Sequence, residues 1–377
     1  MTKIIYWNNI PAPYMIERFN TLSDRSNLDF EVWFNDRVVP DRSWAIDEAT
    51  WKFNYRYLPA ISLFGKKFHF PPMQLLTNKI DILISLYSEP VVLISWLIAY
   101  LKGVKTVFIC EITWDRWIKR RWWKEKIKHI IFPLVDAVIS PGENGKSYAM
   151  RYGASSSKIF TLIHVINVRH YTLGQEKVLL NRDEIRTQLN LKGCTFIYVG
   201  RLWWGKGINY LLEAFAKVQQ QSNVSVSLLL VGDGSEESVL KQVCQDRNIK
   251  NVIFTGFKQQ KELPQYYALA DIFIFPTLGD PYGLVVDEAM ACALPIISTS
   301  AAGEIHDRIE EGINGYIVPP EDSETLADRM LHLVNNPKLC KKMSKASAEK
   351  IADHTLERWA ENFEKIVYQL MSRPDLR

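Results

Sequence analysis

Short apolar runs alternate with segments of helical period along the whole chain. Apolar runs of about four to eight residues are typical of buried strands, and a helical period is typical of helices that cover a sheet. In the first half the pattern predicts strands over Lys3–Trp7, Asp29–Phe34, Ile80–Ser85, Lys105–Ile109 and Ala137–Ile139, and helices over Tyr14–Ser23, Pro90–Leu101, Trp117–Phe132 and Asn144–Tyr152. Residues 35–72 are aromatic-rich and irregular, and the pattern does not place them.

The second half resumes the alternation after a polar passage, Tyr171–Arg182, which we interpret as a linker. It predicts strands over Thr195–Val199, Ser225–Val231, Val252–Thr255, Ile272–Phe275 and Gly315–Val318 and one after Pro295, and helices over Gly207–Gln220, Glu236–Arg247, Lys261–Ala268 and Ser323–Asn335, with another that opens near Tyr282. Such alternation implies parallel sheets. We predict an α/β fold with two doubly wound domains, residues 1–172 and 173–355, and a C-terminal helical segment, 356–377. Ligands of open α/β sheets bind beyond the carboxyl ends of the strands, so we expect a site in the cleft between the domains.

The composition limits the class of protein. The 377 residues suffice for two domains, and the chain has no run of about 18 uncharged apolar residues that could span a membrane. Because Thr2–Trp7 leads directly into a predicted strand, we expect no signal peptide. Five scattered cysteines predict a reduced, cytoplasmic protein, and the lack of CxxC, HxH and HExxH patterns predicts no metal site. The net charge of +4 indicates no partner by itself.

Two carboxylates in the segment Phe275–Thr299, Asp280 and Glu288, are separated by seven residues. Asp280 falls in a loop after a predicted strand, and Glu288 falls about one turn inside the next helix. The amino end of a helix presents unpaired N–H groups and about half a positive charge, which suits a phosphate. The two acids could bind hydroxyl groups of a sugar or a ribose.

The run Gly200–Gly207, GRLWWGKG, directly follows another predicted strand and imitates a P-loop. Gly207 stands where a P-loop requires a magnesium-binding Ser or Thr, which argues against an NTPase. Arg201 and Lys206 could instead supply two cations to a diphosphate, and the glycines would let the backbone approach it. The alternative is a surface turn with solvated cations.

These segments resemble the acid-x7-acid motif and the GR-x4-KG block of retaining glycosyltransferases of family 4, the glycosyl transferases group 1. Further resemblance follows in the same order at Leu228–Gly234, Thr255–Phe257, Ser300–Ile305 and Gly312–Pro319. The resemblance implies a GT-B fold, in which two Rossmann-like domains face a cleft and the C-terminal helix, here Leu356–Met371, returns to the first domain. The N-terminal half matches only loosely.

The resemblance also implies roles for individual residues. Asp280 would contact the sugar near the reacting carbon, and Glu288 would bind the ribose. Arg201 and Lys206 would stabilise the departing diphosphate, and with Asp280 they are the expected catalytic residues of this domain. The residues expected at the UDP- or GDP-sugar donor are Gly200, Arg201, Lys206, Gly256, Phe257, Tyr282, Gly283, Leu284 and Glu288. No separate cofactor and no metal are implied.

The sequence departs from the family at three places. Asp280 stands where Glu is commoner, and a simple N-cap of the helix is an alternative role for it. Where many members carry a His after a strand of the first domain, this chain has Cys110 and Glu111. Glu111 is therefore the candidate catalytic residue on the acceptor side, and a surface or salt-bridged Glu111 is the alternative. The loop Asn8–Tyr14 is similar to a Pro-Tyr loop of a family subset and could border the diphosphate or the acceptor.

The segment Trp114–Lys128 places four tryptophans among many cations. Basic, Trp-rich helices bind anionic membrane surfaces. Such a segment also suits single-stranded nucleic acid, but the chain has no recognisable nucleic-acid module and we expect no such partner. The alternative is a helix that packs its tryptophans against the first sheet.

The sequence thus predicts a retaining, metal-independent hexosyltransferase. It would move a sugar from a UDP- or GDP-sugar to a saccharide or lipid-linked acceptor in cell-surface polysaccharide or glycolipid synthesis, in the cytoplasm and at the inner face of the membrane. Two other classes stay open: a nucleotide-sugar epimerase or hydrolase on the same fold, and a non-catalytic nucleotide-sugar-binding module of an assembly complex.

Overall fold

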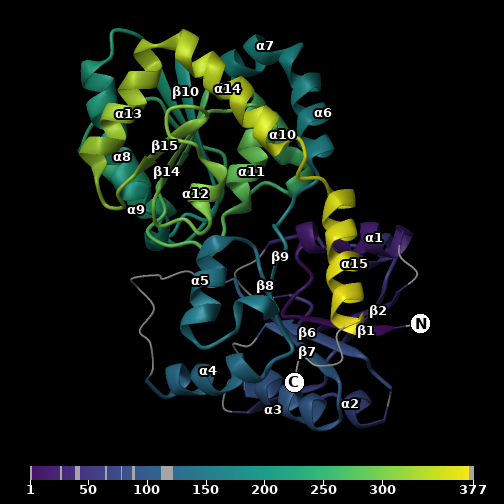
Figure 1. Ribbon diagram of the computed structural model, residues 1–377. Coiled ribbons are helices and arrows are strands. Elements are labelled where there is room, and N and C mark those ends of the chain that lie inside the picture. Colours follow the sequence, from purple (N-terminus) through teal and green to yellow (C-terminus); the bar gives the residue numbers. More distant parts are fainter. Residues whose placement is uncertain are drawn as a thin grey trace. The chain divides into compact units, whose positions relative to one another are not determined.

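The computed structural model describes residues 2–25, 28–38, 43–63, 66–77, 79–86, 90–111 and 122–372 (Figure 1). Contacts divide the chain into two compact units. The first unit holds the described residues up to 111, residues 122–164 and the chain from Leu356 onward, and the second unit holds Val165–Thr355. Each unit is built around one parallel sheet, as the alternating pattern predicted.

The sheet of the first unit has seven parallel strands in the order β3-β2-β1-β6-β7-β8-β9. The strands are β1 (Lys3–Asn8), β2 (Asp29–Phe34), β3 (Asn54–Tyr57), β6 (Ile82–Leu86), β7 (Lys105–Ile109), β8 (Ala137–Ser140) and β9 (Ile159–Thr161). An antiparallel pair, β4 (Ala60–Leu63) and β5 (Lys66–His69), lies in the aromatic-rich region that the sequence did not place. The four central residues of β1 are buried, as in parallel sheets that are covered on both faces.

Helices of the first unit surround this sheet. They are α1 (Pro13–Arg25), η1 (Glu48–Thr50), α2 (Gln74–Thr77), α3 (Pro90–Leu101), α4 (Trp122–Leu134), α5 (Glu143–Arg151), η2 (Ser156–Lys158) and α15 (Leu356–Ser372). Phe363 of α15 packs against Tyr6 of β1 and Phe30 of β2, with ring centroids 6.4 and 6.1 Å apart. Arg25 of α1 pairs with Glu361 of α15 at 3.3 Å. The predicted return of the C-terminal helix to the first domain is therefore confirmed.

The sheet of the second unit has six parallel strands in the order β12-β11-β10-β13-β14-β15. The strands are β10 (Cys194–Val199), β11 (Val226–Val231), β12 (Val252–Phe254), β13 (Ile272–Phe275), β14 (Ile296–Thr299) and β15 (Gly315–Val318). The helices are α6 (Val168–Leu179), α7 (Arg182–Gln188), η3 (Trp204–Lys206), α8 (Ile208–Gln221), α9 (Glu237–Asp246), η4 (Gln260–Glu262), α10 (Leu263–Ala268), α11 (Leu284–Ala291), α12 (Ile305–Arg308), α13 (Ser323–Asn335) and α14 (Pro337–Ile351). Strands β10, β11, β13 and β14 are buried almost throughout, which matches their continuous apolar runs.

The predicted linker, Tyr171–Arg182, is wrong because most of it is helix α6. Tyr171 is fully buried, and its ring lies 6.1 Å from that of Tyr267 on α10. Burial of this one aromatic side chain fixes an otherwise polar helix on the second unit, where α6 packs against α10 and α11. The division between the units falls at Val165, whereas the predicted boundary after residue 172 lies inside α6.

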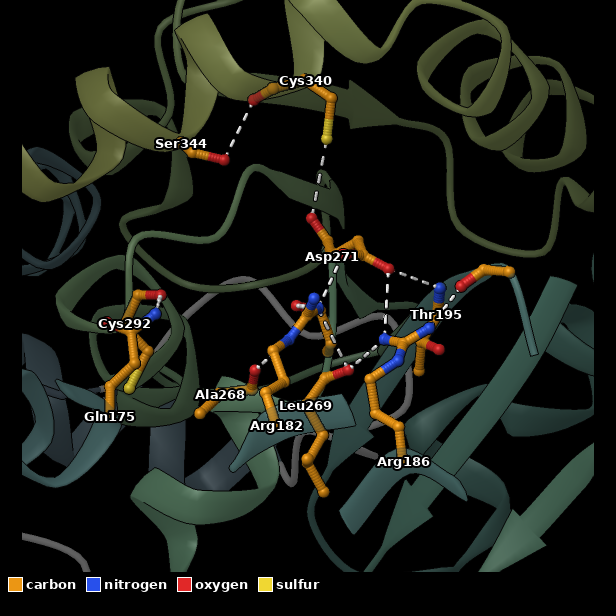
Figure 2. A network of polar contacts seen from close by, with 12 residues as sticks. Gln175, Arg182, Arg186, Thr195, Ala268, Leu269, Asp271, Cys292, Cys340 and Ser344 are labelled. Carbon is orange, nitrogen blue, oxygen red and sulfur yellow. Dashed lines mark hydrogen bonds and ion pairs between the residues drawn. The ribbon is translucent and has the colours of Figure 1, made fainter. Parts of the chain in front are cut away.

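A network around Asp271 fastens the second unit at the amino end of β13 (Figure 2). Its carboxylate accepts hydrogen bonds from Arg182 of α7 at 2.7 Å and from the N–H of Thr195 on β10 at 2.8 Å. Arg186 of α7 lies 3.5 Å from the same carboxylate. The thiol of Cys340 on α14 donates to the carbonyl of Asp271 at 3.6 Å. Asp271 thus joins helices α7 and α14 and strands β10 and β13, through its carboxylate and its backbone carbonyl, at the edge of the sheet opposite to the carboxyl ends of the strands.

Candidate functional site

The second sheet reverses its strand order between β10 and β13. From β10 the chain proceeds to β11 and β12 on one side, and it returns to add β13, β14 and β15 on the other. Such a switch point leaves a crevice beyond the carboxyl ends of the two central strands, where open α/β sheets bind ligands. The loops that leave β10 and β13, residues 200–207 and 276–283, are the two that contain the predicted motifs.

The first loop is shaped by glycines that no other residue can replace. Gly207 has φ of 66° and caps α8 at its amino end. A Cβ at this position would lie 2.0 Å from the carbonyl oxygen of Pro276, which belongs to the second loop. Only glycine therefore lets the two loops meet.

Hydrogen bonds then hold the two loops together. The N–H of Leu278 donates to the carbonyl of Gly205 at 3.0 Å. The hydroxyl of Thr277 donates to the same carbonyl at 3.3 Å and accepts the N–H of Gly279 at 3.2 Å. These bonds fix the backbone on both sides of the switch point. The positions of the side chains that follow are therefore set by the backbone of the two loops.

Lys206 and Asp280 meet across this junction. The ammonium of Lys206 donates to one carboxylate oxygen of Asp280, and the two side chains are only 13% and 16% exposed. The other oxygen of Asp280 accepts the N–H of Tyr282 at 3.0 Å. Each charge offsets part of the cost of burying the other, so the pair can persist in a largely dry site.

The alternative role of Asp280 as a helix cap is wrong. The N-cap of α11 is Gly283, which has φ of 75° and makes no side-chain cap. Asp280 lies three residues earlier, and its side chain closes a turn before the helix begins. The capping signal failed because the sequence pattern placed the start of the helix near Tyr282 and not at Leu284.

The amino end of α11, next to Asp280, has backbone N–H groups without an acceptor in the described parts of the chain. The N–H groups of Leu284 and Val285 have no acceptor among the described residues, and the N–H of Val286 begins the intrahelical bonds. Such free donors and the helix dipole favour an anion. The structure therefore brings Lys206, Asp280, Gly283 and Leu284 together, as the sequence predicted.

Arg308 of α12 stabilises the turn before α11 through hydrogen bonds to its backbone carbonyls. Its buried guanidinium donates to the carbonyls of Tyr282, of Gly283 at 3.0 Å and of Gly303 at 2.8 Å. It lies 3.4 Å from Asp287 and stacks over the ring of Tyr282, 4.2 Å from its centroid. Arg308 was not predicted as a site residue, because nothing in its local sequence pattern distinguishes it from a surface arginine.

Glu288 lies one turn inside α11, as predicted, and is 9% exposed. Its carboxylate accepts a hydrogen bond from the hydroxyl of Tyr267 on α10 at 2.7 Å. Burial and the Glu288 carboxylate raise the pKa of Tyr267, so the phenol stays protonated and remains a donor. Tyr267 therefore orients the second acid, and sequence reasoning did not find it.

The other predicted donor residues lie in loops at the same edge. Arg201 follows Gly200 at the end of β10, and its guanidinium lies 5.4 Å from the centre of the Trp203 ring. Gly256, with φ of 71°, and Phe257 follow β12, and the carbonyl of Gly256 accepts the N–H of Gly232 at 3.0 Å. A Cβ at Gly256 would meet no atom within 4 Å, so its surroundings are open.

Glu111 belongs to the first unit and lies just beyond β7. Its carboxylate is 3.2 Å from Nε2 of His164, and Nδ1 of His164 is 3.1 Å from the buried guanidinium of Arg18. Glu111 thus contacts His164 and its side chain is still 35% exposed, so its role on the acceptor side stays a prediction. His164 and Arg18 were missed, although His164 ends an apolar run that could have been interpreted as a strand.

The described residues include neither a metal-binding cluster nor a membrane-spanning helix. In the part of the chain that the structure describes, no cluster of three or more His, Cys, Asp or Glu side chains could hold a metal ion. Among these residues, too, no helix is long and apolar enough to cross a membrane. Residues 114–121 of the basic, Trp-rich segment lie outside the described residues.

With this geometry in place, the chain can be compared with known proteins. The family model of glycosyl transferases group 1 matches residues 181–350, which include both loops and both acids. These residues are a glycosyl transferases group 1 domain. The resemblance that the motifs indicated is thereby confirmed for the second unit.

Curated relatives match part of the chain. An uncharacterized glycosyltransferase of Methanocaldococcus jannaschii is 31% identical over 188 residues, 47% of this chain and 46% of the relative. N-acetyl-alpha-D-glucosaminyl L-malate synthase of Bacillus anthracis is 26% identical, over 59% of this chain and 62% of its own. Alpha-monoglucosyldiacylglycerol synthase of Acholeplasma laidlawii is 27% identical, over 54% and 49%. The matches thus span about half the length of these relatives.

Solved structures match nearly the whole chain. HepE of Anabaena in complex with UDP aligns with a TM-score of 0.77 at 15% identity, over 98% of this chain and 100% of HepE. The lipopolysaccharide outer core galactosyltransferase WaaB aligns with a TM-score of 0.72 at 16% identity, over 98% and 99%. At these identities the likeness shows the fold, and the predicted GT-B fold is confirmed.

Proposed function

We propose that this chain is a retaining, metal-independent glycosyltransferase that transfers a sugar from a UDP- or GDP-sugar to a saccharide or lipid-linked acceptor. The observation that carries the proposal is the meeting of Lys206, Asp280 and the free amino end of α11 at the switch point of the second sheet. A cation and helix N–H groups suit a diphosphate, and a carboxylate beside them suits the hydroxyls of the attached sugar.

The proposed roles follow from this placement. Lys206, Arg201 and the N–H groups at Gly283 and Leu284 stabilise the negative charge that develops on the departing diphosphate. Asp280 orients the sugar, and Glu288, held by Tyr267, binds the ribose. The base lies at Gly256 and Phe257.

Retention follows from attack on the face that the diphosphate leaves, as the family resemblance implies. The bond between the anomeric carbon and the phosphate oxygen breaks, and the acceptor oxygen forms its bond on the same face. The proton of the acceptor hydroxyl passes to the departing phosphate. No enzyme nucleophile takes part in this scheme.

Names of similar proteins support the donor and acceptor classes. HepE was solved with UDP and, in another structure, with UDP and glucose. The relative from Acholeplasma is named for a glucosyldiacylglycerol product, which is a glycolipid. We therefore expect a uridine nucleotide to bind this chain and an amphiphilic saccharide to be a suitable acceptor class.

The test uses radiolabelled UDP- and GDP-sugars with octyl glycosides as synthetic acceptors, in excess EDTA. Transfer predicts a labelled octyl glycoside with the anomeric configuration of the donor, and it predicts that EDTA leaves the rate unchanged. An isomerised donor without acceptor would indicate an epimerase, free labelled sugar a hydrolase, and nucleotide binding without product a binding module. Activity that EDTA abolishes and manganese restores would contradict the metal-independent part.

A second part of the proposal is peripheral binding to an anionic membrane through the segment Trp114–Lys128. The described part of this segment opens α4, where Trp122 and Trp123 are 70% and 39% exposed. Lys126 lies 5.1 Å from the Trp122 ring and Lys124 lies 5.6 Å from the Trp123 ring. Exposed indoles next to cations suit the headgroup region of an anionic bilayer.

The neighbouring helix α3 supports this placement. It exposes Ile94, Leu97 and Leu101, which follow one another along one face. Trp96 of α3 and Phe132 of α4 belong to one core cluster, so the two helices cover the same part of the first unit. Lys128 does not belong to this surface, because its ammonium donates to Glu125 at 2.8 Å and to the hydroxyl of Tyr148 at 2.7 Å.

Sedimentation with anionic vesicles tests the membrane part. Lys124→Glu with Lys126→Glu should reduce the bound fraction strongly at low salt, since each cation near the surface contributes about 1 kcal/mol. The matched control is Lys341→Glu with Lys342→Glu on exposed positions of α14, which should leave binding within about twofold after the same change in charge. A wild-type protein that stays in the supernatant at low salt contradicts membrane binding and leaves the glycosyltransferase proposal intact.

A further inference from the structure

Three polar side chains from separate elements form a hydrogen-bonded chain in the first unit. Arg18 comes from α1, which follows β1; Glu111 follows β7; and His164 follows β9. The guanidinium of Arg18 is 3.1 Å from Nδ1 of His164, and Nε2 of His164 is 3.2 Å from the carboxylate of Glu111. Residues 146 positions apart in the sequence therefore make direct contact.

The two contacts fix the proton on the histidine ring. A guanidinium can only donate, so Nδ1 of His164 must accept from Arg18 and carries no proton. Nε2 therefore carries the proton and donates it to Glu111. In this arrangement the imidazole lies between a cation and an anion and makes one hydrogen bond to each.

Exposure increases from one end of this chain to the other. Arg18 is 1% exposed, the side chain of His164 is 13% exposed, and that of Glu111 is 35% exposed. One carboxylate oxygen of Glu111 contacts His164, and the other, Oε2, has no hydrogen-bond partner in the described parts of the chain. The buried residues thus support a carboxylate whose free oxygen can reach a ligand.

The groups around Glu111 favour the charged form of its carboxylate. Burial raises the pKa of Glu111, but His164 and Arg18 together lower it by more, so that the pKa of this carboxyl lies below its ordinary value. Burial and the nearby Glu111 carboxylate raise the pKa of the phenol of Tyr6 on β1. The guanidinium of Arg18 also lies 5.2 Å from the centre of the Tyr14 ring.

Arg18, His164 and Glu111 also lie at the carboxyl edge of the first sheet, where ligands are expected to bind. In the first sheet the strand order reverses between β1 and β6, so the ligand crevice is expected beyond the carboxyl ends of these strands. Arg18 and Tyr14 belong to the helix that leaves β1, and Glu111 leaves β7, the neighbour of β6. At this edge the carboxylate of Glu111 is partly exposed and contacts His164 through one of its oxygens.

We propose that Glu111 accepts a hydrogen bond from a hydroxyl of the sugar acceptor other than the attacking one, whose proton passes to the departing phosphate, and that His164 and Arg18 are positioning residues that hold its carboxylate for this contact. The inference rests on the proposed glycosyltransferase function and assigns a hydroxyl of its acceptor to a defined oxygen, Glu111 Oε2. His164 and Arg18 touch no substrate in this arrangement. No covalent bond to the protein forms.

Two substitutions of His164 test the positioning role. His164→Gln keeps one acceptor and one donor, so it can still join Arg18 to Glu111; His164→Leu keeps the volume but neither contact. With octyl glycosides as acceptors, we expect His164→Leu to lower kcat/KM for the acceptor by about tenfold to a hundredfold, because misplacement of a reacting group is costly, with the KM for the donor unchanged. His164→Gln should recover most of the loss.

The control is His69→Leu. His69 makes another contact with a carboxylate in the same unit, 3.5 Å from Asp36, but it lies on β5 and not beyond β7. We expect His69→Leu to leave acceptor kcat/KM within about twofold, after thermal unfolding has shown that each variant is folded. A second measurement needs no turnover: ¹⁵N spectra of histidine-labelled protein should show His164 protonated at Nε2 only.

The outcomes separate this inference from the proposed function. Normal acceptor kcat/KM in His164→Leu, or equal losses in His164→Leu and His164→Gln, would overturn the positioning role while transfer itself stands. An Nδ1-protonated His164 would also overturn it. A wild-type protein that binds UDP but consumes no donor with any acceptor would overturn both.

Discussion

The carboxyl edges of the two sheets have the same topology and opposite chemistry. Both sheets reverse their strand order at a central pair, β1 and β6 in one unit and β10 and β13 in the other. At the second sheet the edge presents Lys206 and the free donors of α11. At the first sheet it presents the carboxylate of Glu111. Under the proposed function, the second edge binds an anion and the first accepts a hydrogen bond from a hydroxyl.

The difference lies in how each edge treats its charges. In the second unit the acid Asp280 is bound to Lys206 and to a backbone N–H, so the ion pair is largely satisfied before any ligand binds. In the first unit the acid is satisfied on one side only. The comparison indicates that a doubly wound sheet supplies the place, and the loops after its central strands supply the ligand class.

The largest expected effect comes from the acid of the second edge. Asp280→Ala should lower kcat by about 100-fold to 1,000-fold, because it removes a contact that strengthens in the transition state. Nucleotide affinity should change much less, and Asp280→Glu should restore part of the rate. Steady-state kinetics with the donor that the transfer assay identifies provide the measurement.

The control for this substitution is Asp322→Ala, which removes a side-chain cap from α13 far along the chain. It should cost about 1 kcal/mol of stability and leave kcat unchanged. If Asp280→Ala behaves like Asp322→Ala, Asp280 has a structural role only, and the contrast between the two edges loses its catalytic meaning.

Lys206→Ala tests the charge of the same edge. It should weaken UDP or GDP binding by about 1.5–3 kcal/mol, or roughly tenfold to 150-fold, because a charge-assisted bond to the diphosphate is lost and Asp280 is left unpaired. Titration calorimetry measures the affinity. Lys217→Ala serves as the matched control, since Lys217 pairs with the exposed Glu324 elsewhere in the unit. Equal nucleotide affinity in wild type and Lys206→Ala would remove the central site assignment.

Much of the fold could be predicted because its signals are local. Continuous apolar runs gave the buried strands β2, β7, β13 and β15 with their observed bounds, and helical period gave α3 and α13. The linker prediction failed where one buried aromatic, Tyr171, outweighs a polar helix surface. Strands β3, β4 and β5 could not be placed because each is only 4 residues long and includes polar residues, so none forms an apolar run.

The site was predictable to the extent that its residues lie within one loop or one helix. Asp280, Gly283 and Glu288 keep a spacing that the sequence shows directly. Tyr267, Arg308, His164 and Arg18 come from distant segments, and only the strand order brings them to their partners. A single sequence carries no record of such long-range pairs.

A smaller effect is expected at the amino edge of the second sheet, where Asp271 joins α7 to β10 (Figure 2). Asp271→Ala should lower the free energy of unfolding by about 2 kcal/mol, because it leaves Arg182 and the N–H of Thr195 without their carboxylate partner. Nucleotide affinity should stay unchanged, since the carboxyl edge is intact. A lower affinity that persists where the protein is fully folded would show that the two edges are not independent.

The smallest effect concerns the charge of Glu111 and depends on pH. The pKa of this carboxyl is lowered in the folded protein, chiefly through His164 and Arg18 acting against burial. A carboxyl whose pKa is lowered by folding contributes stability above its unfolded pKa of about 4.3 and loses it as pH falls through the lower, folded value. The melting temperature of Glu111→Gln should therefore lie below that of the wild type at pH 7, and the gap should close in acid. His164 supplies part of this effect. At neutral pH the melting temperatures of His164→Leu and of the double variant His164→Leu with Glu111→Gln should therefore differ by less than those of the wild type and Glu111→Gln. A gap that is constant from neutral to acidic pH would mean that the carboxylate gains nothing from its partners, and the charged, half-satisfied acid that distinguishes the first edge would then have no energetic basis.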